Sequence, residues 1–187
     1  MRSFGWWWLR GQAVVWLLAG RSAQALAVFD DMARRFPGEA YPLASRAHLL
    51  AQQGRHDDAL ADYRRLVELH PADPAGWFNL GFVLENIGRF DEALAAFQRA
   101  TGLDPKLDRA WYGLGLTLIR QHRFDDAVAA LKRNTELQPM SPYGWYQLAR
   151  VQVDREKPEE ARKIIRHLKT FEPKVAEQLV RETGLQP

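Results

Sequence analysis

The chain has 187 residues, of which 47% are hydrophobic and 26% charged, a balance typical of a folded globular protein rather than a disordered one. It contains no cysteine, which excludes disulfides and thiolate metal sites. The formal net charge is only +3 and acids and bases are interspersed, so the composition gives no reason to expect a nucleic-acid partner.

The first segment of the chain, residues 3–20, is apolar and has Arg10 as its single charge. Three interpretations remain open for it. It is the first helix of an N-terminal hairpin, or a secretory signal with cleavage after Ala25, or a helix that lies against a membrane interface through Trp6, Trp7 and Trp8. Its uninterrupted apolar run is too short for a standard spanning helix.

We favour the hairpin, because a period of 34 residues begins in this segment and organises almost the whole chain. Cleavage after Ala25 would also leave the helix around Phe29 without its partner. Several independent series share the period, which excludes coincidence. They are Pro37, Pro71, Pro105, Pro139 and Pro173; Ala25, Ala59, Ala93, Ala127 and Ala161; Trp77, Trp111 and Trp145; Leu80, Leu114 and Leu148; and Ala13, Ala47, Gly81, Gly115 and Ala149.

Residues 74–107 show how each repeat specifies two helices. Apolar residues recur at helical spacing up to Gly88, which breaks the first helix and permits a left-handed cap. Asp91 and Glu92 begin the second helix, where acids suit the positive end of the helix dipole. Pro105 then prevents the helix from continuing. Small residues in the alanine and glycine series are expected to let the two helices approach closely.

The last part of the chain, residues 174–184, predicts one further helix. Its apolar stripe is opposed by charged and amide side chains, as expected where the end of a repeat array meets water.

No constellation in the sequence indicates catalysis or metal binding. Gly113-Leu114-Gly115 resembles part of a nucleotide-binding loop, but it lies inside a predicted helix and no strand precedes it. The five histidines include no pair with the spacing of a helical metal site and an acid partner. We therefore expect no enzymatic activity, catalytic residue, metal ion, cofactor or small-molecule substrate.

The order Trp, Leu-Gly, Ala, Phe and Pro within 34 residues resembles the tetratricopeptide repeat (TPR). The resemblance covers residues 6–173 and implies an all-α fold, a right-handed α-solenoid of about five helical hairpins plus a C-terminal capping helix. The whole chain, 1–187, would then be a single array. Its expected parts are hairpins at about 6–39 (degenerate), 40–73, 74–107, 108–141 and 142–173, and a capping helix at 174–184.

The same resemblance implies that the protein binds another protein in a concave groove lined by the first helix of each hairpin. The family's groove positions correspond here to Tyr41, His48, Phe78, Asn79, Phe82, Arg109, Tyr112, Arg120, Tyr143, Tyr146 and Arg150. Phe78, Tyr112 and Tyr146 lie on the face that the core does not require, and aromatic residues and arginine are frequent binding hot spots. The alternative is that these aromatic side chains only pack against the next hairpin.

The N-terminal helix departs from the rule that a terminal repeat presents a polar face to water. Leu9, Ala13 and Trp16 occupy its core positions. The side chains expected to remain exposed as an apolar docking edge are Trp6, Trp7, Trp8, Val14, Val15 and Leu18, together with Leu17. We expect this edge to be covered by another protein, by a second copy of the chain, or by lipid.

The sequence therefore predicts an adaptor or assembly factor in the cytoplasm. The alternative is a membrane-associated or exported, periplasmic subunit that is anchored by the tryptophan-rich helix.

Overall fold

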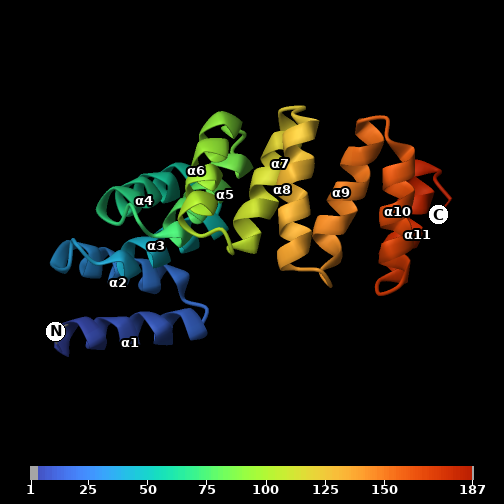
Figure 1. The fold of residues 1–187 in the computed structure, drawn as a ribbon. Helices are drawn as coiled ribbons and strands as arrows, with labels where there is room; N and C mark the ends of the chain where they lie inside the picture. The colour runs from blue at the N-terminus through green and yellow to red at the C-terminus, as the bar shows by residue number, and fades with distance from the viewer. Residues whose placement is uncertain (1–3, 187) are drawn as a thin grey trace. The chain divides into compact units, whose positions relative to one another are not determined.

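The computed structural model of the chain describes residues 4–186, and every regular element in this range is a helix. The eleven helices of the described residues follow one another through short turns (Figure 1). They are α1 (Phe4–Leu18), α2 (Ser22–Arg35), α3 (Ala40–Gln52), α4 (His56–Leu69), α5 (Pro74–Asn86), α6 (Phe90–Leu103), α7 (Asp108–Arg120), α8 (Phe124–Leu137), α9 (Pro142–Asp154), α10 (Pro158–Lys169) and α11 (Pro173–Thr183). The predicted all-α fold is confirmed.

The chain divides into two compact units between residues 87 and 88. In unit 1, which contains α1 to α5, each helix packs against the next one along the chain. In unit 2, which contains α6 to α11, the same sequential packing continues, and α11 contacts both α9 and α10. Gly88, the first residue of unit 2, has a φ of +79°, the left-handed conformation that the sequence predicts at this position.

Small side chains line the contact between the two helices of the hairpins that lie within one unit. All five alanines of the series that begins at Ala25 are completely buried. On the facing helix of one hairpin, Gly115 is also buried, and a Cβ atom placed there would lie 2.7 Å from Cγ of Leu131 in α8. The predicted close approach is therefore confirmed for this hairpin, because no larger residue fits without displacing Leu131.

In three repeats, the tryptophan of one series forms a hydrogen bond with the proline of the other. The indole Nε1 of Trp77 donates to the carbonyl oxygen of Pro71 at 2.9 Å. The same bond joins Trp111 to Pro105 at 3.0 Å and Trp145 to Pro139 at 2.8 Å. Each bond ties the start of a hairpin to the loop that precedes it, and so helps to set the angle at which the chain enters the new helix.

A charged cluster interrupts the apolar packing of unit 1. Arg46 stands where the later hairpins have the leucine series, and its guanidinium donates to both carboxylate oxygens of Asp62, at 2.7 and 2.5 Å. It also donates to Asp30 at 2.5 Å. The hydrogen bonds to Asp62 are the main reason that the pKa of Arg46 is raised above its usual value. Asp62 is only 6% exposed. The Arg46–Asp62 pair therefore occupies the positions that hold the buried residues Leu114 and Ala130 in the hairpin 108–141.

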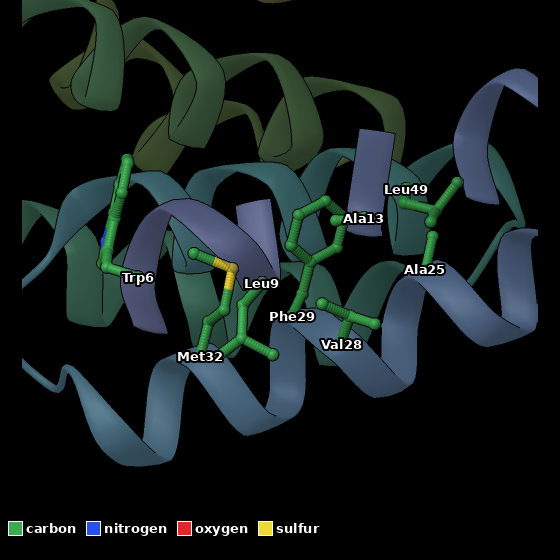
Figure 2. Close-up of a cluster of buried hydrophobic side chains, with 8 residues drawn as sticks. All are labelled: Trp6, Leu9, Ala13, Ala25, Val28, Phe29, Met32 and Leu49. Carbon is green, nitrogen blue, oxygen red and sulfur yellow. The ribbon is translucent and has the colours of Figure 1, made fainter. Parts of the chain in front are cut away.

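The first hairpin buries Trp6, Leu9 and Ala13 of α1 against Ala25, Val28, Phe29 and Met32 of α2 and Leu49 of α3 (Figure 2). Trp6 is 1% exposed, so its predicted place on the exposed edge is wrong. The reason is its spacing. Trp6 lies three residues before Leu9, which brings it onto the same buried stripe. Trp16, expected in the core, is only partly buried against this cluster.

Among residues 4–186, no helix combines the length and the apolar character that crossing a bilayer requires.

A matched pair of glycine variants tests the close approach within the hairpin. Gly115 and Gly102 both lie within helices, but an added Cβ at Gly102 meets nothing within 4 Å. Both variants gain the helix propensity of alanine, while only Gly115→Ala overpacks the hairpin. We expect Gly115→Ala to be less stable than Gly102→Ala by about 1–3 kcal/mol in urea unfolding. Equal stabilities would show that the contact tolerates a larger side chain.

The charged cluster makes a second prediction for stability. Asp62→Ala leaves the guanidinium of Arg46, whose side chain is 25% exposed, without its main partner. We expect a loss of roughly 3 kcal/mol in denaturant unfolding, at the low end for a broken buried pair because Arg46 keeps some contact with water. The double variant Arg46→Leu with Asp62→Ala should recover most of this stability, because it installs the residue types of the later hairpins. A double variant as unstable as Asp62→Ala would contradict this account.

Candidate functional site

Unit 2 carries two adjoining hollows that share Tyr112 and Tyr143. The first has a volume of about 490 Å³ and is lined by Tyr112, Pro142, Tyr143, Tyr146, Gln147, Glu172, Val175 and Gln178. The second has a volume of about 370 Å³ and is lined by Asp108, Arg109, Tyr112, Asn134, Gln138, Ser141 and Tyr143. Together they form a concave surface built by α7, α9 and α11, with contributions from α8 and the loop after it.

The local packing of α9 explains why its tyrosines face outward. Gly144 is buried, and a Cβ atom there would collide with Asn134 of α8. The absent side chain lets α9 lie directly on α8, while Asn134 donates from Nδ2 to the carbonyl of Asp108 at 2.9 Å. With this face of α9 against α8, Tyr143 remains 70% exposed and Tyr146 is half-buried.

A polar network joins α9 to α11 at the first hollow. The Tyr146 hydroxyl donates to Oε2 of Glu182 at 2.6 Å, and Gln178 donates to Oε1 of the same carboxylate at 2.8 Å. Arg150 donates to the Tyr146 hydroxyl at 3.3 Å. The hydrogen bond from Tyr146, and then that from Gln178, lower the pKa of Glu182. Tyr146 therefore holds α11 beside α9 as well as lining the hollow.

The contribution of α11 to this surface is a feature that the sequence analysis missed. Glu172, Val175 and Gln178 line the first hollow, although the sequence predicts residues 174–184 only as a cap. One signal could have revealed it. Leu179 of α11 is completely buried, as Leu148 of α9 nearly is. It follows Leu148 by 31 residues, three fewer than the repeat, so α11 resembles a first helix that begins three residues early.

The remaining groove residues predicted in unit 2 lie outside these hollows. Arg120 is exposed at the end of α7, and Arg150 is exposed on α9 next to Tyr146. Arg109, in contrast, lies at the start of α7 and lines the second hollow.

In unit 1 the predicted groove residues have different surroundings. Phe78 and Phe82 of α5 stack with ring centroids 6.4 Å apart, and Phe82 is 51% exposed. His48 is exposed and its Nε2 lies 3.1 Å from Nε2 of Gln52, while Asn79 is half-buried. Tyr41 is half-buried, with its ring 5.8 Å from that of Trp6. Tyr41 thus contributes to the packing of the N-terminal hairpin.

The predicted edge on α1 is exposed apart from Trp6. Trp7, Trp8, Val14, Val15 and Leu18 are between 40% and 85% exposed. Within residues 4–186, no three or more histidine, aspartate or glutamate side chains are grouped so that they could hold a metal ion.

Family models described as tetratricopeptide repeat match residues 6–31, 45–108 and 87–145. The chain belongs to the tetratricopeptide repeat family. The resemblance stated from the 34-residue pattern is therefore confirmed, and so is the fold class that it implied. No curated protein matches the chain significantly.

Solved structures with the same fold share little sequence with this tetratricopeptide chain. The crystal structure of MamA is 19% identical, with 92% of this chain and 94% of that one aligned at a TM-score of 0.83. YrrB, described as a TPR protein with an unusual peptide-binding site, is 18% identical over 90% of this chain and 88% of its own, with a TM-score of 0.77. A tetratricopeptide repeat protein from Parabacteroides merdae is 17% identical over 97% and 75%, with a TM-score of 0.84.

The network around Tyr146 makes a testable prediction. Glu182 accepts the phenol hydrogen bond as a carboxylate, so this bond stabilises the folded protein above the ordinary pKa of glutamate and is lost as the pH falls. Tyr146→Phe should raise the pKa of Glu182 towards its ordinary value, measured by NMR titration of the side-chain carboxyl carbon. Amide hydrogen exchange in α11 should also become faster. Tyr143→Phe is the control, and an unchanged titration in Tyr146→Phe would contradict the assigned bond.

Proposed function

We propose that this tetratricopeptide chain is an adaptor or assembly factor, and that the two hollows of unit 2 bind a segment of a partner protein. The observation that carries this proposal is the surface shared by Tyr112 and Tyr143, which joins the hollows into one concave site. The structural fold supports a protein-interaction role, since tetratricopeptide repeats form a protein-interaction fold.

The chemistry of the site supports a peptide segment as the ligand. Tyrosine provides a large contact area for a small loss of conformational entropy, and tyrosine and arginine are enriched among binding hot spots. Tyr143 lies exposed between the two hollows, and Arg109, Gln147 and Gln178 offer hydrogen bonds around them. A few polar groups around an apolar concavity are the usual composition of a specific binding site.

One protein with the same fold supports a peptide segment as the ligand. YrrB, which shares the fold, is described as having an unusual peptide-binding site. In unit 1 we propose that the exposed side of the Phe78–Phe82 stack, with His48 and Asn79, forms a further contact surface for a partner. The N-terminal edge is a separate surface with different chemistry.

The experiment compares proteins captured by the wild-type chain with those captured by Tyr112→Ala, Tyr143→Ala and the control Met140→Ala. Met140 is 68% exposed, close to the 70% of Tyr143, but it lines neither hollow. A genuine partner should be retained by Met140→Ala and lost from both tyrosine variants. Its measured affinity should fall by about 2 kcal/mol for each tyrosine, roughly 30-fold in Kd, with little change in Tm.

Equal affinity of the partner for the wild type and both tyrosine variants would overturn the proposal. Arg109→Ala adds an independent check, because Arg109 lies in the second hollow only. A loss of affinity accompanied by a large fall in Tm would indicate damage to the fold rather than to the site.

A further inference from the structure

The helix α1 has two apolar faces. Its inner face packs against α2 (Figure 2), and its outer face is exposed. Of the eleven exposed large hydrophobic side chains in the described residues, seven lie on α1. They are Phe4, Trp7, Trp8, Val14, Val15, Leu17 and Leu18. Most of them follow one another at spacings of three and four, so they share one side of the helix.

In the later hairpins, the equivalent face of the first helix packs on the second helix of the preceding hairpin. The positions one to four repeats after Val15 are Leu49, Val83, Thr117 and Val151, each 7% exposed or less. The positions equivalent to Trp8 are Pro42, Gly76, Ala110 and Gly144, all of them buried. A Cβ atom on Gly144 would collide with Asn134 of α8. The stacking of helices at this face therefore depends on a small or compact residue.

At the outer face of α1, this position holds the large side chain of Trp8 instead of a small residue. Trp8 is 58% exposed. Its bulk keeps another helix from approaching at the distance that the array uses, so the face is not shaped for a further hairpin of this kind. The far end of the chain offers no better match, because the exposed side chains of α11 are mostly charged or amide groups.

The charge of the N-terminal segment indicates what kind of partner the outer face of α1 would bind. Residues 1–29 contain Arg2, Arg10 and Arg21 and no acid, which leaves 23 basic and 23 acidic residues in the rest of the chain. The whole formal surplus of +3 therefore lies in this segment. The Arg10 guanidinium lies 5.5 Å from the ring centroids of Trp6 and Trp7 and 4.9 Å from that of Tyr41. The Arg21 guanidinium lies 5.4 Å from the ring centroid of the half-buried Trp16. Basic residues beside exposed tryptophan and leucine are typical of helices that bind anionic membrane surfaces.

We propose that the outer face of α1 binds the surface of a membrane that contains anionic phospholipid. The helix lies in the plane of the interface, with Trp7, Trp8, Val15 and Leu18 among the acyl chains. Arg10 and Arg21 contact phosphate groups. The inner face remains packed on α2, so binding needs no unfolding of the hairpin.

The test uses the chain with vesicles of phosphatidylcholine alone and of phosphatidylcholine with phosphatidylglycerol. We expect binding to the anionic vesicles in co-sedimentation, at least tenfold weaker binding to the neutral ones, and a decrease at high salt. Tryptophan emission should shift to shorter wavelength and be quenched by brominated phospholipid. Trp7→Glu with Trp8→Glu should abolish binding, and Arg21→Glu should weaken it several-fold. Leu69→Glu, at a residue that is 43% exposed on α4, should bind as the wild type does.

Circular dichroism shows whether each variant is folded. A folded wild-type chain that ignores anionic vesicles would overturn the proposal, as would binding that survives the double tryptophan variant. A dimer that forms in solution, disappears in that variant and is accompanied by no vesicle binding would assign the face to a second copy instead.

Discussion

Within each unit, the hairpins depend on the close approach of their two helices at small side chains. The alanines of the series that begins at Ala25 are fully buried, and the facing positions hold alanine or glycine. Because nothing larger separates the backbones, large residues above and below this contact can interlock, and the leucine and aromatic series fill that space. The hydrogen bonds from the repeated tryptophans to the preceding proline carbonyls then link each hairpin to the loop before it.

The first helices also pack on the second helix of the preceding hairpin, and only the part of their surface between these two contacts remains exposed. In α9 the side against α8 contains Gly144, while Tyr143 is exposed and Tyr146 reaches across to Glu182 of α11. The structural role of α11 and its place in the candidate site are therefore connected. The same helix covers the last hairpin and supplies Val175 and Gln178 to the first hollow.

The outermost helices of the described residues, α1 and α11, expose different kinds of surface. At the C-terminal end, α11 buries Ala176 and Leu179 and exposes charged side chains. At the N-terminal end, α1 obeys the core pattern through Leu9 and Ala13, but its outer face is apolar as well. An apolar outer face on a helix is costly in water unless something covers it.

The sequence by itself determined the fold, because the 34-residue period repeats the same buried positions and each position needs a particular size of side chain. It also separated most core positions from exposed ones, as the exposure of Tyr143 and Phe82 illustrates. Only the tertiary structure decided that Trp6 is buried, that Arg46 pairs with Asp62 in place of a leucine contact, and that α11 lines a hollow with α9. These outcomes depend on which side chains from different helices meet in space, and a periodic pattern records positions along one helix but not the partners that pack against it.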